Sequence, residues 1–359
     1  MLKTERMDRV RAALRAQGLT QMIVCDPKSV WYLTGVAVEP YERLLALYLP
    51  TEGEPVLFLN RLFNVPEPPC RTVWHTDTDK PVAQIAEVVD AGKPLGIDKE
   101  WPAKFLIPLM ETHPGMQVVL SSDCVDDCRA CKDAEEQTLM REASRINDAV
   151  NEAAKHYIKA GMTEREVAEF IDAQYRAHGC EGPSFTTIVS FGANAADPHH
   201  EPDDTVLKEG DCVLFDMGCV KSRYCSDMTR TWFCGQPTEK QAAVHDLVRR
   251  ANEAAEALIK PGVRLCELDA AARDLITEAG YGAYFNHRLG HFIGQTDHEK
   301  GDVSSANTTV ARPGIIFSIE PGVYLPGEFG VRVEDLVLVT ETGCEVLNRN
   351  DKHWDVVGK

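Results

Sequence analysis

The sequence contains no long hydrophobic run, no excess of basic residues and no common phosphate-binding or serine-hydrolase motif. A membrane helix requires about 20 apolar residues in succession, so we expect no transmembrane segment. The chain has 38 lysines and arginines against 56 aspartates and glutamates, which gives a formal net charge of −18. Such an acidic surface repels phosphate groups, so we expect neither nucleic acid nor anionic membranes as partners. The absence of a Walker loop, a GxGxxG fingerprint and a GxSxG elbow argues against the enzyme classes that these motifs mark.

Features of a secreted protein are also scarce. The first six residues are mostly charged or polar, where a secretory signal would place an apolar core, so we expect a cytoplasmic protein. Its 12 cysteines are spread through a long chain, and we expect buried free thiols rather than disulfides. Cys124, Cys128 and Cys131 have the spacing of a radical-SAM iron–sulfur motif. They lie in a polar segment before a helix and not behind a barrel strand, which argues against a cluster.

The 359 residues exceed one ordinary domain core and fit two domains. In the first part, helical patterns alternate with short apolar strands, which predicts an α/β domain over residues 1–123. We interpret residues 124–133 as a linker. A long helical pattern opens the second domain, 134–359, in which strand pairs flanked by helix pairs predict an α+β fold. Thr163 and Glu166 form a capping box at the start of one of these helices.

Two pairs of acidic residues lie in apolar segments that have the pattern of β-hairpins. If Lys221 and Ser222 form a hairpin tip, Asp216 opposes Asp227, and a turn at Pro326 and Gly327 places Glu320 opposite Glu334 in the same way. Opposed carboxylates destabilise a strand pair and are relieved by a cation. Two solvated surface acids would explain one pair alone, but two such pairs favour a shared cation site. A one-residue slip would move an acid to the other face.

A histidine between glycines, His291, completes this set of candidate ligands. Four carboxylates and a neutral imidazole balance two divalent cations, and a water between them would ionise near neutral pH. Oxygen-rich ligation without thiolates points to Mn²⁺, Co²⁺ or Fe²⁺, with Zn²⁺ as a further possibility. His287 and His291 also have the spacing of a helical zinc-protease motif, but Arg288 stands where that motif requires its glutamate.

These motifs resemble those of the pita-bread metallopeptidases, which include prolidase, aminopeptidase P and methionine aminopeptidase. The resemblance implies a pita-bread (creatinase/aminopeptidase-like) catalytic domain with two divalent metal ions, Mn²⁺ or Co²⁺ before Zn²⁺ or Fe²⁺. It assigns five metal ligands: Asp216, Asp227, His291, Glu320 and Glu334. Residues 183–185, 194–200 and 298–299 resemble the prolidase and aminopeptidase P branch, as does the creatinase-like N-terminal domain.

The resemblance also implies a mechanism in which hydroxide held by the metals attacks a peptide carbonyl, with Glu320 relaying the proton. His199 and His298 are predicted to donate hydrogen bonds to the oxyanion, and His200 is an alternative to His199. Arg332 lies two residues from Glu334, so it shares a strand face and is predicted to orient a metal-bound carboxylate. A surface salt bridge is the alternative role for Arg332.

The branch that the chain resembles predicts hydrolysis of the bond between any residue and a following proline, chiefly in dipeptides. Cleavage of longer peptides by aminopeptidase P action, cleavage of a non-peptide C–N or C–S bond, and a non-catalytic peptide-binding module are the alternatives. The family usually has glycine after the metal histidine, and Phe292 in that place is expected to narrow the pocket. The resemblance also predicts a homodimer, with Trp31 and Tyr32 as candidate contacts.

Overall fold

The structure is a computed structural model, which describes residues 2–359. The chain divides into two compact units between Arg129 and Ala130. This division falls inside the segment 124–133 that we interpreted as a linker, but residues Asp123–Ala130 form helix α5. Cys124 of α5 is buried in the core of the first unit. Within the described residues, no helix combines the length and the apolar character needed to cross a membrane.

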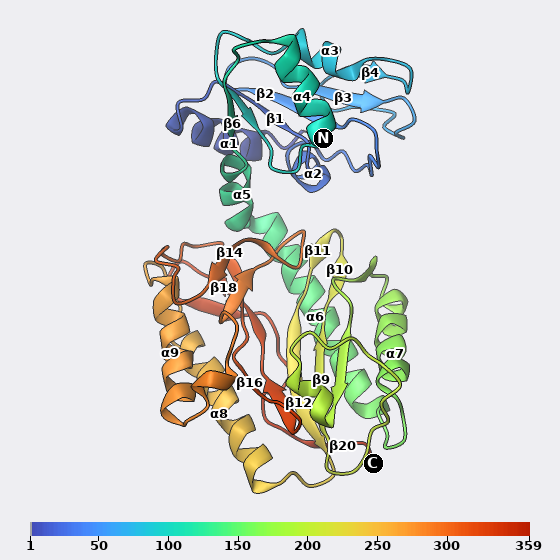
Figure 1. The fold of residues 1–359 in the computed structure, drawn as a ribbon, viewed down its shortest axis with the longest axis vertical. Helices are drawn as coiled ribbons and strands as arrows, with labels where there is room; N and C mark the ends of the chain where they lie inside the picture. Colours follow the sequence, from blue (N-terminus) through green and yellow to red (C-terminus); the bar gives the residue numbers. More distant parts are fainter. Residues whose placement is uncertain (1) are drawn as a thin grey trace. The chain divides into compact units, whose positions relative to one another are not determined.

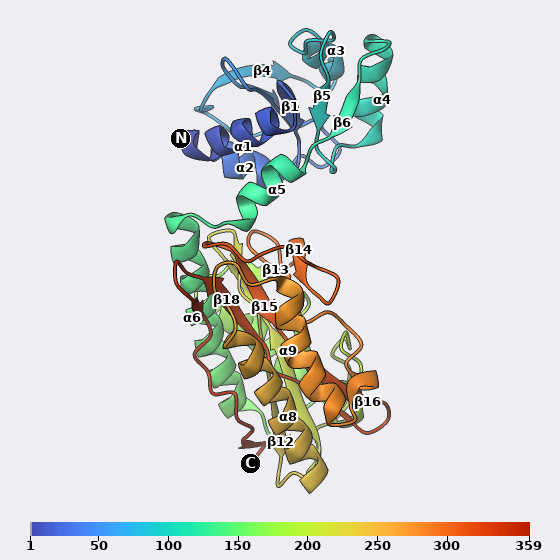
Figure 2. The same ribbon diagram turned by 90° about the vertical axis from the view of Figure 1, so that its left-hand side faces the viewer.

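The first unit is a three-layer α/β domain around one mixed sheet, as predicted from its alternating pattern (Figure 1). The strand order is β4-β3-β2-β1-β5-β6. The strands are β1 (Gln21–Val24), β2 (Ala46–Pro50), β3 (Val56–Asn60), β4 (Arg71–His75), β5 (Leu95–Ile97) and β6 (Val118–Leu120). The helices are α1 (Thr4–Ala16), α2 (Pro27–Thr34), α3 (Pro81–Ala86) and α4 (Ala103–Thr112). Alternate strand residues enter two separate cores, one under α1 and α2 and the other under α3 and α4 (Figure 2).

One of the two predicted dimer contacts, Tyr32, lies on helix α2. Asp26 caps this helix by accepting hydrogen bonds from two backbone amides, and Pro27 occupies its first turn. The helix turns Tyr32 into the core, where its ring lies 4.7 Å from the Arg6 guanidinium and its hydroxyl donates to the Cys128 carbonyl at 3.2 Å. The prediction of Tyr32 as a contact with a partner subunit is therefore wrong for this structure, because the side chain is fully buried.

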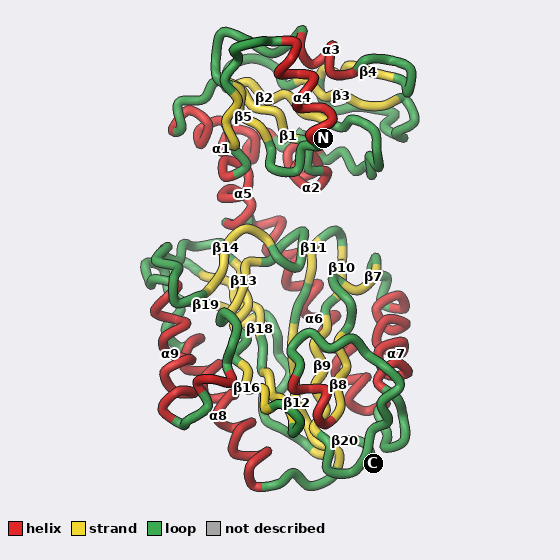
Figure 3. Tube along the Cα trace, viewed as in Figure 1, coloured by secondary structure: helices red, strands yellow, loops and turns green. Residues whose placement is uncertain are grey.

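The second unit places two helix pairs against its two larger β-sheets (Figure 3), and the short strands form two further sheets, β11-β10-β7 and β16-β17. Helices α6 (Ala134–Tyr157) and α7 (Glu164–Ala177) share a core with the sheet β20-β12-β9-β8. Helices α8 (Glu239–Glu256) and α9 (Leu265–Glu278) share a core with the sheet β14-β13-β15-β18-β19. The strands are β7 (Gly182–Pro183), β8 (Ile188–Phe191), β9 (Cys212–Met217), β10 (Cys219–Lys221), β11 (Tyr224–Cys225), β12 (Met228–Cys234), β13 (Gly290–Phe292), β14 (Glu299–Val303), β15 (Ile316–Ile319), β16 (Gly322–Leu325), β17 (Phe329–Arg332), β18 (Asp335–Val339), β19 (Cys344–Val346) and β20 (Val356–Val357).

The capping box predicted at Thr163 and Glu166 is present at the start of α7, where each side chain accepts from the backbone amide of the other residue. Asp133 with Glu136, and Thr238 with Gln241, begin α6 and α8 in the same way. These local signals explain why α6 and α7 begin where the sequence pattern predicts them.

The first hairpin has a different register from the predicted one. Its tip is Ser222 and Arg223, both with positive φ (50° and 70°), as a tight two-residue turn requires. Asp216 therefore pairs with Thr229 and not with Asp227. Because Asp227 lies two residues from Thr229, the two acids are diagonal neighbours on one face.

The second hairpin has the predicted register. Ser318 pairs with Leu336 below the acids and Gly322 pairs with Arg332 above them, so both ladders place Glu320 opposite Glu334. Gly327 takes the positive φ of 75° that the turn after Pro326 requires. This hairpin therefore brings its two carboxylates to the same level of the fold.

Acid stability is expected to depend on His245, which is 1% exposed on α8. Burial lowers its pKa from 6.5 to about 4. As the pH falls through 6.5 the unfolded chain takes up this proton, whereas the folded protein does so only near pH 4. Stability should therefore fall across this window, by up to about 3 kcal/mol for this group. His245→Leu is expected to weaken the pH dependence in urea titrations at pH 7 and pH 5.

The exposed His156, replaced by alanine, is the control for this prediction, because it lies at the surface of α6 beside Glu152. The free energy of unfolding of His156→Ala should depend on pH as that of the wild type does. Equal pH dependence for the wild type and His245→Leu would contradict the role of the buried imidazole.

Candidate metal centre

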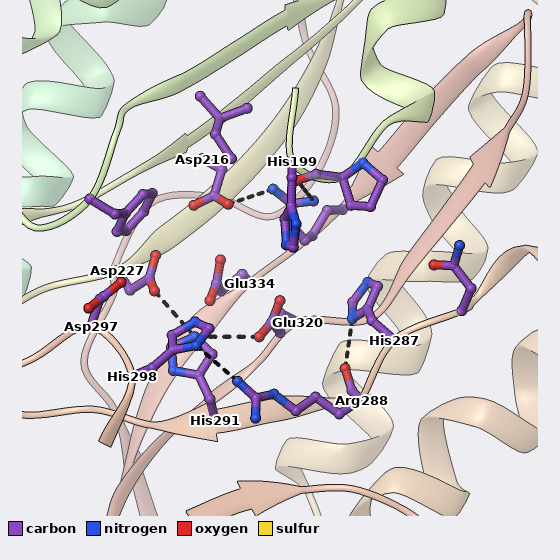
Figure 4. Close-up of a pocket in the computed structure, with 15 residues that line it drawn as sticks. His199, Asp216, Asp227, His287, Arg288, His291, Asp297, His298, Glu320 and Glu334 are labelled. Carbon is purple, nitrogen blue, oxygen red and sulfur yellow. Dashed lines mark hydrogen bonds and ion pairs between the residues drawn. The ribbon is translucent and has the colours of Figure 1, made fainter. Parts of the chain in front are cut away.

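One cavity of the second unit, about 710 Å³ in volume, contains every side chain that the sequence predicted for the site. These are Asp216, Asp227, His291, Glu320 and Glu334 as metal ligands, and His199, His298 and Arg332 as other site residues. They come from separate segments, and Figure 4 shows that the five candidate ligands and the two histidines point toward a common centre. Sequence reasoning thus selected groups that the fold brings together.

The five candidate ligands are placed by strands of both sheets. Asp216 lies in β9 and His291 in β13, whereas Asp227, Glu320 and Glu334 flank strand ends. Oxygen or nitrogen atoms of Asp227, His291 and Glu334 lie within 4.8 Å of one another. His291 Nε2 is 3.5 Å from both Asp227 Oδ2 and Glu320 Oε1. These donors are close enough to share cations.

The electrostatics of the cluster fit divalent cations. Burial, followed by the charges of neighbouring carboxylates, raises the pKa of Asp227 and of Glu334 well above the usual values. Burial also raises the pKa of Glu320 to about 7. Among the described residues, Asp216 Oδ1 and Asp227 Oδ1 are buried without any hydrogen-bond partner. Such acids are stable as carboxylates only beside positive charge, and the donor set of oxygens with one imidazole suits Mn²⁺, Co²⁺, Fe²⁺ or Zn²⁺.

A second cluster, formed by Glu164, His200 and Asp203, has ligand-like spacing but different surroundings. Both oxygens of Glu164 already accept hydrogen bonds, from the amides of Phe191 and Asp203 and from the side chains of Asn194 and His200. This cluster ties the start of α7 to the loop after η1 (Gly192–Ala196). It also distinguishes two neighbouring histidines, because His200 points to Glu164 at 2.7 Å whereas His199 lines the cavity.

Arg332 connects two of the candidate ligands and is buried, which excludes the surface salt bridge. Its Nη2 donates to Asp216 Oδ2 at 2.5 Å, and its Nε donates to Thr229 Oγ1 at 3.0 Å. Thr229 Oγ1 in turn donates to Glu334 Oε2 at 2.6 Å. Arg332 Nη1 donates to the Tyr324 hydroxyl at 2.9 Å. The guanidinium fork therefore orients Asp216 directly and Glu334 through Thr229.

Replacing Arg332 by methionine is expected to lower kcat/KM by about 10- to 100-fold and to weaken metal binding, as loss of a hydrogen bond to a ligand does. Kinetics and metal titration with a chelator measure both effects. Arg264→Met is the control, because this arginine is exposed and pairs with Glu267 outside the cavity. Unchanged metal affinity and turnover in a folded Arg332→Met protein would contradict the orienting role.

Sequence reasoning missed several residues of the cavity, including His287, Arg288 and Asp297. His287 lies after the short helix η2 (Gly282–Tyr284), and its Nε2 is 2.9 Å from the Tyr324 hydroxyl. Burial, and then Arg332, lower its pKa to about 4. Its spacing to His291 matches a helical zinc motif in the sequence, whereas in the structure this segment is a loop leading into β13.

Phe292 does not narrow the cavity, contrary to the expectation from the sequence. Its side chain is buried in the core on the other side of β13, where its ring lies 6.0 Å from that of Phe317. Successive side chains of a strand point to opposite faces, so the residue after His291 is directed away from the site. The identity of this residue therefore carries no argument about substrate length.

The fold and the cavity define a metallopeptidase with a separate α/β domain before its catalytic domain. The chain belongs to metallopeptidase family M24, whose family model matches residues 138–341. Residues 6–131 match the creatinase/prolidase N-terminal domain. The chain is 36% identical over 347 residues to an uncharacterized peptidase of Staphylococcus epidermidis, covering 96% of this chain and 98% of the relative.

Solved structures of related enzymes superpose over nearly the whole chain. The dipeptidase PepE of Mycobacterium ulcerans is 34% identical, with a TM-score of 0.92 and coverage of 99% of this chain and 97% of that one. The prolidase of Pyrococcus horikoshii is 31% identical, with a TM-score of 0.89 and coverage of 97% and 99%. Xaa-Pro dipeptidase and X-Pro aminopeptidase structures share the fold as well. The predicted pita-bread catalytic domain and creatinase-like N-terminal domain are therefore confirmed.

Proposed function

We propose that this metallopeptidase hydrolyses the bond between an N-terminal residue and a following proline, chiefly in dipeptides. The observation that carries this proposal is the convergence of the five candidate ligands with His199 and His298 in one cavity. The similarity to solved prolidases and dipeptidases supports the substrate class. The proposed cofactor is a pair of divalent ions, Mn²⁺ or Co²⁺ before Zn²⁺ or Fe²⁺, held by Asp216, Asp227, His291, Glu320 and Glu334.

When bound, such ions activate water and polarise the substrate carbonyl. The chain then has to move a proton and stabilise the developing negative charge. Glu320, held by a hydrogen bond from Ser318 Oγ at 3.1 Å, is proposed to carry the proton from water to the leaving nitrogen. His298 and His199 are proposed to donate hydrogen bonds to the oxyanion from opposite sides of the cavity (Figure 4).

An Xaa-Pro bond is a tertiary amide without an N–H group, so a site for it needs shape rather than a hydrogen-bond acceptor at that position. Phe185, Ile188 and Pro198 form an apolar part of the cavity wall. We propose that this part receives the proline ring. A peptidase that requires this N–H as a hydrogen-bond donor handles such a bond poorly.

The proposal is tested by incubating metal-reconstituted protein with Ala-Pro, Ala-Pro-Ala and the non-proline control Ala-Ala, while released amino acids are measured. Rapid cleavage of Ala-Pro alone is the expected result. Cleavage of the tripeptide without the dipeptide would favour aminopeptidase action. No cleavage of any peptide would favour a non-peptide substrate or a binding function.

We further propose that the enzyme is a homodimer, as its resemblance to the prolidase branch implies. Light scattering at micromolar concentration should give twice the mass of 39.8 kDa. A fully active monomer would contradict this proposal.

A further inference from the structure

The cavity wall contains an arginine to which the proposed chemistry assigns no group of the substrate. Arg288 and Arg332 both line the cavity. Arg332 is bound to Asp216, Thr229 and Tyr324. Among the described residues, by contrast, no carboxylate forms an ion pair with Arg288, and its side chain forms one hydrogen bond, from Nη2 to His298 Nδ1 at 3.0 Å. Most of the N–H donors of this guanidinium are therefore available to a ligand.

The backbone of Arg288 is anchored while its side chain reaches into the cavity. Its carbonyl accepts from His287 Nδ1 at 2.7 Å, and His287 Nε2 is in turn bonded to Tyr324. Figure 4 shows the guanidinium extending from this anchor toward His298. A cation held in place before the ligand arrives loses little freedom on binding.

The position of the guanidinium is close to the reacting centre. The His298 ring lies between Arg288 and His291, with a distance of 3.9 Å between the two imidazole centroids. In a dipeptide, three bonds separate the scissile carbonyl carbon from the carboxylate carbon, a distance of about 4 Å or less. We consider a dipeptide whose scissile carbonyl lies at the candidate metal ligands. Its carboxylate is then separated from the Arg288 guanidinium by no more than the width of one imidazole ring. In a longer peptide, a neutral amide occupies this place.

We propose that Arg288 binds the free α-carboxylate of a two-residue substrate and thereby selects dipeptides over longer peptides. This inference rests on the proposed function, since it assumes a peptide substrate with its scissile carbonyl at the candidate ligands. The planar guanidinium matches a carboxylate through two parallel hydrogen bonds, which an amide cannot form. The remaining N–H groups continue to hold His298.

The test compares Ala-Pro with Ala-Pro amide, which differ in the charge at this position alone. Arg288→Met should lower kcat/KM for Ala-Pro by about 10- to 100-fold more than for the amide, the range for a hydrogen bond to a charged group. Arg288→Lys should retain part of the preference. Arg312→Met, at an exposed arginine outside the cavity wall, is the control and should behave as the wild type.

A binding measurement gives a second readout that is independent of turnover. In calorimetric titrations, proline should bind the wild type more tightly than prolinamide, and Arg288→Met should remove this difference. An equal loss for Ala-Pro and its amide, with the proline preference intact, would overturn the inference and assign Arg288 to His298 alone. If the wild type cleaves neither compound, the proposed function itself fails, which is a distinct outcome.

Discussion

Glu334→Gln is expected to abolish metal-dependent activity and to stabilise the metal-free protein. The carboxyl is 2% exposed, and burial together with Asp227 and Glu320 raises its pKa well above the usual value. At neutral pH the folded metal-free protein must protonate this group or keep it charged without solvent, whereas the unfolded chain ionises it freely. Glutamine removes this penalty and can still accept the hydrogen bond from Thr229.

The same substitution removes a proposed metal ligand, so kcat/KM should fall by about 10³-fold or more. This loss exceeds the loss of about 10- to 100-fold that is typical of residues that only orient metal ligands. Metal analysis, kinetics and thermal unfolding with and without Mn²⁺ measure the two effects. Glu328→Gln is the matched control, because this exposed acid pairs with Lys240 near the turn of the same hairpin. A variant that keeps its metal and its turnover would contradict the assignment.

His298→Ala is expected to retain metal and fold but to lose about 10²- to 10³-fold in kcat, the range for removing one oxyanion donor. Partial burial, and then His291, lower the pKa of His298 to about 4, so the ring is neutral at pH 7. Because Arg288 donates to Nδ1, the proton of the neutral ring resides on Nε2, from which it can be donated to substrate.

Metal content and steady-state kinetics of His298→Ala and His199→Ala test this role. His156→Ala, at an exposed position on α6, provides the control. Loss of metal would reassign the histidine as a ligand. Near-normal turnover in both cavity variants would mean that the oxyanion is stabilised by other groups.

The two hairpins show where local patterns suffice and where they do not. Pro326 and Gly327 mark a turn by their backbone preferences, and the register of the second hairpin followed from them. The first hairpin turns at Ser222 and Arg223, which adopt positive φ without a glycine or asparagine to indicate it. The predicted pairing of Asp216 with Asp227 was therefore displaced, although both acids still reached the same face.

The sequence by itself determined the two-domain α/β and α+β organisation, the helix starts and the residue types that gather in the cavity. These features depend on near neighbours in the chain, through periodicity, caps and short motifs. Only the tertiary structure decided which of His199 and His200 lines the cavity, that Phe292 points away from it, and that Arg288 reaches His298. Side-chain direction at these places depends on packing between segments distant in sequence, and a local pattern contains no information about that packing.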